Sequence, residues 1–132
     1  MQPPVIERWH RIVQTRDPKL LDALLADDVV FESPVVFTPQ AGKPITTVYL
    51  TAALHVLNND SFRYLNQWHG AESAVLEFMT TIDGIAINGV DIIEWNAAGQ
   101  ISRFKVMVRP LKAMNLLHQQ MGKMLDQLSR RP

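Results

Sequence analysis

Apolar residues recur every three or four positions in the first part of the chain, the spacing that places them on one face of an α-helix. Runs of this kind cover 5–15, 17–27 and 44–57, and each has a proline near its start, where a helix tolerates it best. A β-branched and aromatic stretch at 29–32 predicts a strand, and the proline- and glycine-containing segment 35–43 predicts a loop. The first sixty residues are therefore expected to form three helices with one early strand.

Beyond residue 60 the period changes from helical to alternating, which is typical of half-buried strands. Four such runs predict strands at 62–69, 74–82, 85–95 and 101–108. The short segments between the second and third and between the third and fourth runs carry glycine, as the turns of β-hairpins do. These four strands are expected to form an antiparallel meander.

A last helical run is predicted over about 111–128, after Pro110. Helices first, then strands, then one helix indicate an α+β fold, with a curved antiparallel sheet and helices on its concave face. Such a sheet and its helices would enclose a cone-shaped pocket, and residues 1–132 are expected to form one domain. The expected apolar stripe of the terminal helix is Leu111, Met114, His118, Met121, Leu125 and Leu128.

Composition narrows the classes of function. The formal net charge is zero, so the chain lacks the basic excess of a protein that binds nucleic acid or an anionic membrane. Without cysteine, the chain has no disulfides, thiolate nucleophiles or cysteine-ligated zinc. Its four histidines do not form a ligand pair at metal spacing, and we expect no metal and no cofactor. The N-terminus lacks a signal pattern and no apolar run is long enough to span a membrane, so a cytoplasmic location is expected.

Asp91 is the most informative residue, because it lies in the middle of an apolar strand, between Val90 and Ile92. A carboxylate there must face solvent or line a cavity, since burying it unpaired is costly. Inside a cavity its pKa would rise, and the neutral acid could donate a proton or polarise a carbonyl oxygen. The alternative is that Asp91 hydrogen-bonds a neighbour within a filled core.

Strand alternation predicts which other side chains share the inner face with Asp91. The expected lining is largely apolar and surrounds one acid. From the strands it consists of Leu76, Phe78, Thr80, Ile93, Phe104, Val106 and Val108, and from the opposite side of Trp9, Val13 and Phe31.

Four local patterns together resemble the nuclear transport factor 2-like superfamily, in particular its SnoaL-like and ketosteroid-isomerase-like branch. They are Asp17 followed by Ala26-Asp27-Asp28, the strand end Phe31-Glu32-Ser33-Pro34, Gly42 before the third helix, and the run from Asn88 to Trp95 that leads into Gly99-Gln100-Ile101. The resemblance covers about 5–110 and implies a cystatin-like α+β barrel with a small-molecule pocket.

The resemblance also assigns roles to three positions. The isomerase-like oxyanion-hole aspartate falls on Asp91, the general-base aspartate on Ser33, and the tyrosine of the first helix on Trp9. A serine hydroxyl does not shuttle a proton unaided near neutral pH, and an indole N–H donates without being acidic. Asp91 is therefore the expected catalytic residue, Ser33 a weak polar contact in the pocket lining, and Trp9 a packing residue that supplies one N–H.

These residues leave three functions open. The first is an isomerase-, cyclase- or hydratase-like enzyme that acts on a small apolar molecule through Asp91 without the usual general base. The second is a non-catalytic module that binds such a molecule. The third is a dimeric scaffold whose cone is filled by side chains. Strand alternation points Glu32 away from the pocket. No role is assigned to Glu32 or to His10.

The outer face of the predicted sheet mixes charges with apolar side chains. Such an exposed face is suited to pairing with a second copy, and in the resembled superfamily pairing through this sheet is common. We therefore expect a homodimer. The residues expected on this face are Arg103, Lys105, Arg109, Glu77, Glu94, Val75, Met79 and Met107.

Overall fold

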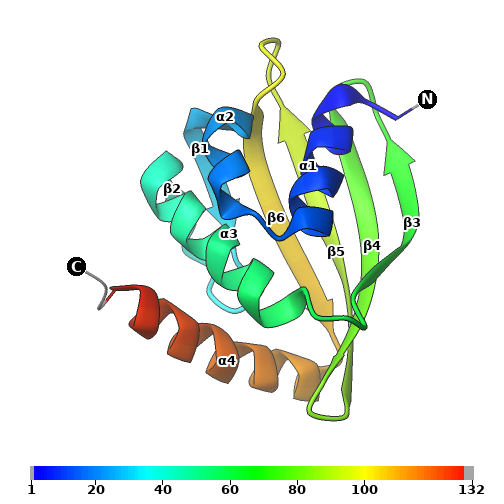
Figure 1. Ribbon diagram of the computed structural model, residues 1–132, viewed down its shortest axis with the longest axis vertical. Coiled ribbons are helices and arrows are strands. Elements are labelled where there is room, and N and C mark those ends of the chain that lie inside the picture. The colour runs from blue at the N-terminus through cyan, green and yellow to red at the C-terminus, as the bar shows by residue number, and fades with distance from the viewer. Residues whose placement is uncertain (1, 130–132) are drawn as a thin grey trace.

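The computed structural model describes residues 2–129, in which four α-helices, one short 3-10 helix and six strands follow one another (Figure 1). The α+β class predicted from the sequence is confirmed. In chain order the elements are α1 (Pro4–Thr15), η1 (Pro18–Leu20), α2 (Leu21–Leu24), β1 (Leu25–Glu32), β2 (Gln40–Ala41), α3 (Lys43–Leu57), β3 (Arg63–His69), β4 (Ser73–Ile82), β5 (Ile85–Trp95), β6 (Ile101–Arg109) and α4 (Leu111–Ser129).

One curved sheet runs through the molecule, with the strand order β2-β1-β6-β5-β4-β3. Strands β3 to β6 form the predicted antiparallel meander, whereas β1 pairs with β6 in parallel. Helices α1, α2 and α3 lie over one face of the sheet, and α4 packs along α3 (Figure 1). The buried apolar core fills the space between the helices and the inner face of the sheet.

The second predicted helix is shorter than the sequence indicated, because β1 begins at Leu25 rather than at residue 29. Leu25 and Val29 are fully buried, and Leu25 pairs with Ile101 of β6, so this segment gains more from joining the sheet than from a further helical turn. The segment predicted as a loop also contains β2, whose two residues pair with Val30 and Phe31.

The apolar stripe predicted for the terminal helix is correct only in part: Met121 packs against the core, but two other members face solvent. Leu111 is 76% exposed and His118 is exposed, whereas Ala113 and Leu117 are buried. Apolar residues occur on both sides of this helix, so the spacing alone fits either face, and packing against α3 decides which face turns inward.

Alternation along the strands of the meander separates the two faces of the sheet. Asp91 lies opposite Leu76 on β4 and Val106 on β6, so the three side chains share the inner face. No helix among the described residues is long and apolar enough to cross a membrane.

Candidate functional site

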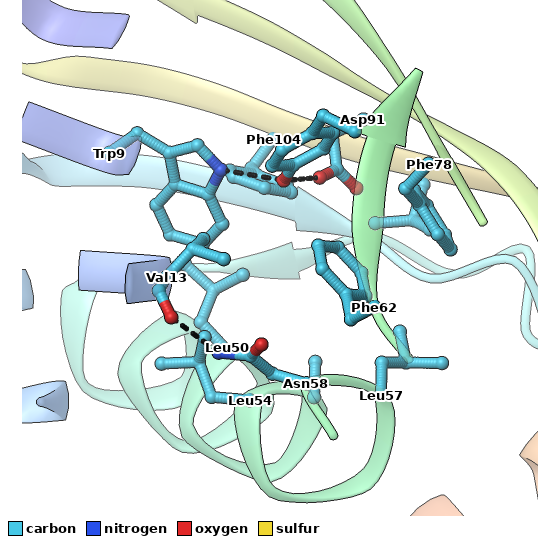
Figure 2. A pocket seen from close by; sticks show the side chains of 13 residues that line it. Trp9, Val13, Leu50, Leu54, Leu57, Asn58, Phe62, Phe78, Asp91 and Phe104 are labelled. Carbon is cyan, nitrogen blue, oxygen red and sulfur yellow. Dashed lines mark hydrogen bonds between the residues drawn. The ribbon is translucent and has the colours of Figure 1, made fainter. Parts of the chain in front are cut away.

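A chain of two hydrogen bonds connects three elements around Asp91 (Figure 2). The indole Nε1 of Trp9, on α1, donates to the hydroxyl oxygen of Tyr64 on β3 at 2.9 Å. The Tyr64 hydroxyl in turn donates to Oδ2 of Asp91 on β5 at 2.6 Å. No hydrogen bond connects the other carboxyl oxygen, Oδ1, to any described residue. One oxygen of Asp91 is therefore fixed by protein and the other is left for a different partner.

Asp91 is buried, with 6% of its surface exposed, and this burial controls the charge of its carboxyl group. Loss of solvation raises the pKa of this carboxyl from 3.8 to about 7, although the hydrogen bond from Tyr64 acts in the opposite direction. Burial, and next the nearby carboxylate of Asp91, raise the pKa of Tyr64 well above its ordinary value. Near neutral pH the site therefore holds a neutral phenol and a carboxyl that binds a proton far more readily than an exposed aspartate does.

An apolar cavity lies beside this carboxyl. The space that the centre of a water molecule can reach in it is about 40 Å³, and one ordered water needs roughly 10 to 15 Å³ of such space. Among residues 2–129, Asp91 and Tyr64 are the only ionisable side chains in the lining. The cavity is bounded by Trp9, Val13, Leu50, Ala53, Leu54, Leu57, Asn58, Phe62, Tyr64, Phe78, Asp91, Phe104 and Val106.

Gly89 makes room for one wall of this cavity. It lies opposite Phe78 in the β4–β5 pairing, on the same face as Asp91. A Cβ atom at this glycine would lie 2.5 Å from Cζ of Phe78 and 2.6 Å from the carbonyl oxygen of Met107. The missing side chain therefore lets the Phe78 ring lie across β5 and reach the cavity.

The structure brings only part of the predicted lining to this cavity. Trp9, Val13, Phe78, Phe104 and Val106 surround it together with Asp91, as the alternation indicated. The other predicted residues lie on the inner side of the molecule but not in the wall of this cavity. Leu76, Thr80 and Ile93 are packed into the core, Val108 is half-buried, and Phe31 and Ser33 line a separate cavity.

That second cavity offers about 30 Å³ and lies between the end of β1 and α4. Ala53, Leu57 and Val106 line both cavities and so form the wall between them. Ser33 lines this second cavity and not the one beside Asp91, and its hydroxyl oxygen accepts a hydrogen bond from the backbone N–H of Val35 at 3.0 Å. The serine that takes the position of a general base stabilises a turn instead.

The hydroxyl group that contacts Asp91 comes from Tyr64, a residue to which the resemblance assigned no role. The indole N–H of Trp9 donates to Tyr64 rather than into the cavity, and Tyr64 is the hydroxyl that contacts Asp91. Tyr64 was not among the site residues predicted from the sequence. Alternation along the strand predicted at 62–69 would put Phe62 and Tyr64 on the same face of the sheet. That pattern gives a face but no partner, because the contact between α1 and β3 joins residues 55 positions apart.

Neither of the two residues without an assigned role hydrogen-bonds to Asp91, although the His10 ring packs edge-on against Tyr64 with 5.1 Å between the ring centroids. Nε2 of His10 lies 2.6 Å from the side-chain oxygen of Gln67. Glu32 forms an ion pair with Arg103 at 2.5 Å and a second with Lys105 at 3.9 Å. Among the described residues, no cluster of three or more His, Asp or Glu side chains has the arrangement of a metal site.

This arrangement supplies an acid without a matching base. Protonated Asp91 can donate from its second oxygen to an acceptor in the cavity, and the desolvated surroundings strengthen such a bond. A reaction that moves a proton between two carbon atoms also needs a group to remove the first proton. No second carboxylate or histidine lines either cavity among residues 2–129.

Comparison with known proteins agrees with this geometry. The model of the SnoaL-like domain family matches residues 6–104. A crystal structure of a steroid delta-isomerase from Pseudomonas aeruginosa is 34% identical, covers 96% of this chain and 93% of its own, and superposes with a TM-score of 0.90. A search of curated protein sequences finds no match.

Two further solved structures extend the comparison. A conserved bacterial protein with a cystatin-like fold, from Silicibacter pomeroyi, is 31% identical over 91% of this chain and 84% of its own, with a TM-score of 0.84. An NTF2-like protein from Mesorhizobium loti, 20% identical over 80% of this chain and 88% of its own, has a TM-score of 0.70 and shares the fold. The chain therefore belongs to the SnoaL-like domain family, with an NTF2-like fold related to that of ketosteroid isomerases.

Proposed function

We propose that this protein binds a small, mainly apolar molecule that carries an acceptor oxygen, and that Asp91 hydrogen-bonds and polarises that oxygen. The observation that supports this most directly is the buried carboxyl beside an apolar cavity, with one oxygen held by Tyr64 and a pKa of about 7. A neutral acid in such surroundings is a hydrogen-bond donor that needs no reorganisation when the ligand arrives.

The cavity limits the size of the molecule. Its volume of about 40 Å³ admits a small ligand group in the described conformation. A larger ligand requires the wall formed by Ala53, Leu57 and Val106 to move, which would join the cavity to the one beside Ser33. The ligand class that fits without such a change is a compact ketone, aldehyde or ester.

Binding experiments at several pH values test this proposal. Cyclohexenone and cyclohexene have similar shapes, but only the ketone accepts a hydrogen bond. We expect the ketone to bind more tightly below pH 7 and to lose this advantage as pH rises through the Asp91 pKa of about 7, because the ionised carboxylate no longer donates. Asp91→Asn should remove the pH dependence, and Glu77→Gln on the outer face should keep it. Equal binding of the two probes at every pH would contradict the proposal.

Catalysis and binding without turnover are the two forms that this function can take. The relative from Pseudomonas aeruginosa is named a steroid delta-isomerase, and its 34% identity supports an isomerase-like reaction. The position of Ser33, in the lining of the second cavity and hydrogen-bonded to Val35, favours binding without turnover. Deuterium exchange at the carbon next to a bound ketone carbonyl separates the two. Exchange that depends on Asp91 indicates catalysis, and binding without any exchange indicates a binding module.

We also propose that the outer face of the sheet pairs two copies of the chain. Trp68 on β3 and Met107 on β6 are 56% and 52% exposed, and the strand register places Trp68 next to Val75 and Met107 next to Val90 on this face. Arg103 of β6 forms ion pairs with Glu32 and Glu94 of the neighbouring strands β1 and β5. Met107→Glu should yield monomers in light scattering, whereas Gln119→Glu on α4 should not change the mass. A monomeric wild-type chain would exclude the dimer.

A further inference from the structure

A wider, polar hollow near the end of α1 adjoins the Asp91 cavity. This hollow offers about 370 Å³ on the same measure. Val13, Asn58, Phe62 and Tyr64 line both spaces, so they form a neck between the apolar cavity and the hollow. We call the hollow the vestibule. The residues that line it are His10, Val13, Gln14, Arg16, Asn58, Asn59, Asp60, Phe62, Arg63 and Tyr64.

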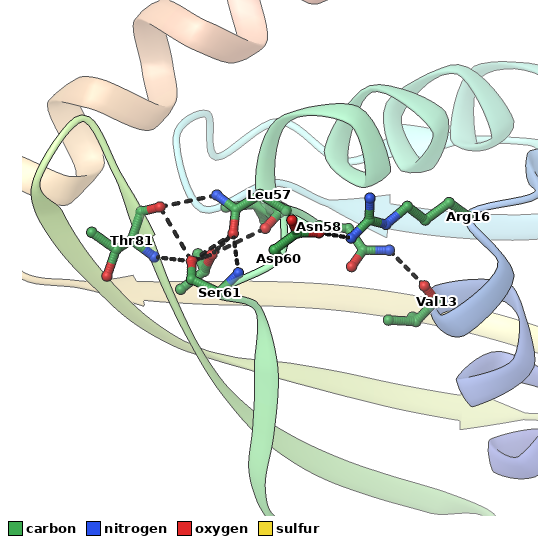
Figure 3. A network of polar contacts seen from close by, with 9 residues as sticks. Val13, Arg16, Leu57, Asn58, Asp60, Ser61 and Thr81 are labelled. Carbon is green, nitrogen blue, oxygen red and sulfur yellow. Dashed lines mark hydrogen bonds and ion pairs between the residues drawn. The ribbon is translucent and has the colours of Figure 1, made fainter.

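A hydrogen bond across the neck fixes its width. The side-chain amide of Asn58, at the end of α3, donates to the backbone carbonyl of Val13 on α1 at 2.6 Å (Figure 3). This contact joins the two helices at the passage between cavity and vestibule. A molecule that reaches Asp91 through this neck leaves its other end in the vestibule.

The vestibule carries more positive than negative charge. Arg16 and Arg63 are cationic, and Asp60 is the only acid in the lining. Arg16 reaches from the end of α1 to Asp60 at 3.1 Å, but the Asp60 side chain is fully exposed, so solvent weakens this ion pair (Figure 3). Arg63 donates to the backbone carbonyl of Ser61 at 3.3 Å and forms no ion pair with any described residue. One guanidinium is therefore available to an anion.

We propose that the ligand is amphipathic, with an apolar body in the Asp91 cavity and a carboxylate in the vestibule that contacts Arg63 and Arg16. This inference rests on the proposed function, because it assigns the outer end of the same ligand. Guanidinium groups bind carboxylates through paired hydrogen bonds. A monoanion fits better than a phosphate dianion, because the net charge of the lining is small and the carbonyl end of α1 adds partial negative charge there.

A matched set of three probes tests this assignment by calorimetry at low salt. The probes are 4-acetylbenzoate, 4-acetylbenzamide and 4-acetylphenyl phosphate, which share the ketone end and differ at the other end. We expect wild-type protein to bind the carboxylate about tenfold more tightly than the amide, a difference typical of one charge-assisted contact. The phosphate should bind less tightly than the carboxylate.

Variants of the vestibule show which residues produce the difference. Arg63→Gln should remove most of the preference for carboxylate, and Asp60→Asn should increase it by releasing Arg16. Arg103→Gln on the outer face should leave it unchanged. Affinity for the amide should stay constant in all three variants, which separates loss of the anion contact from misfolding.

The outcomes also separate this inference from the proposed function. Equal binding of carboxylate and amide, with affinity that still depends on Asp91, overturns the carboxylate contact alone. Tighter binding of the phosphate overturns the choice of carboxylate. Binding of cyclohexenone without binding of any of the three probes overturns the inference alone. Binding of neither cyclohexenone nor the three probes overturns the proposed function, and the inference with it.

Discussion

Asp91 and Glu77 lie on neighbouring strands, point to opposite faces of the sheet and have pKa values that shift in opposite directions. Burial on the inner face raises the pKa of Asp91 to about 7. On the outer face, side-chain hydrogen bonds from Asn66 and Asn88, at 2.9 and 3.1 Å, lower the pKa of Glu77. The same sheet thus favours the neutral form of the Asp91 carboxyl and the charged form of the Glu77 carboxyl.

The difference lies in what each face offers a carboxylate. The inner face provides one phenol and otherwise apolar side chains, whereas the outer face provides solvent, two amides and Arg109. Alternation of the strand decides which environment each residue meets, because neighbouring residues point to opposite faces. A displacement of one residue in β5 would turn Asp91 to the outer face and leave Glu77 on β4 in place.

The largest expected effect concerns stability and pH. Asp91 binds a proton more tightly in the folded state, whose pKa is about 7, than in the unfolded chain, at 3.8. The folded state therefore loses stability as pH rises between these values, by about 4 kcal/mol for a shift of about three units. Asp91→Asn should gain this amount relative to wild type between pH 4 and pH 8, in urea unfolding.

The outer carboxyl provides the contrasting control for that measurement. The lowered pKa of Glu77 stabilises the folded state above the ordinary glutamate pKa, and this contribution is lost as pH falls. Glu77→Gln should therefore lose stability relative to wild type at neutral pH and not at low pH. The same slope in both variants would show that the two faces do not differ in the proposed way.

A second change tests how closely the inner face is packed. Gly89→Ala places a Cβ against the Phe78 ring and the Met107 carbonyl, and overpacking of this kind costs about 1 to 3 kcal/mol. Gly122→Ala in α4 meets nothing within 4 Å and should stabilise the helix by about 0.5 to 1 kcal/mol. Thermal unfolding of the two variants should therefore shift in opposite directions. A neutral Gly89→Ala would mean that the Phe78 ring moves aside freely.

A third change alters the inner carboxyl without touching it. Tyr64→Phe removes the hydrogen bond that lowers the pKa of Asp91, so this pKa should rise above its wild-type value of about 7. Carbon-13 NMR titration of the aspartate carboxyl measures it directly. Trp9→Phe, which leaves the Tyr64 hydroxyl in place, serves as the comparison and should move the Asp91 pKa less. A lower Asp91 pKa in Tyr64→Phe than in the wild type would contradict the expected direction.

The smallest effect is expected on the outer face. Asn66→Ala removes the largest cause of the lowered Glu77 pKa, which should rise toward its ordinary value while Asn88 still donates. The same NMR titration detects this shift, and the Asp91 pKa should not change. A response at Asp91 would show that the two faces are coupled through the sheet.

Local pattern predicted the sheet better than the site. The third meander strand lies at 85–95, as the alternation of apolar residues around Asp91 indicated, because half-buried strands carry their period in the sequence. The resemblance assigned Asp91 to the oxyanion-hole position. The contact from Tyr64 to Asp91 joins residues 27 positions apart, so no local sequence pattern predicts it. The position of Ser33 depends on a turn that the strand period does not describe.

Leu57 belongs to the walls of both inner cavities, and this has a consequence for how new specificity arises in such a protein. Shortening the Leu57 side chain would thin the wall, which Ala53 and Val106 complete, between two compartments that are separately too small for a multi-ring ligand. The Asp91 cavity would then extend further toward Ser33 and α4. A substitution at this one position is therefore expected to lengthen the space available to a ligand, while Asp91 stays in place.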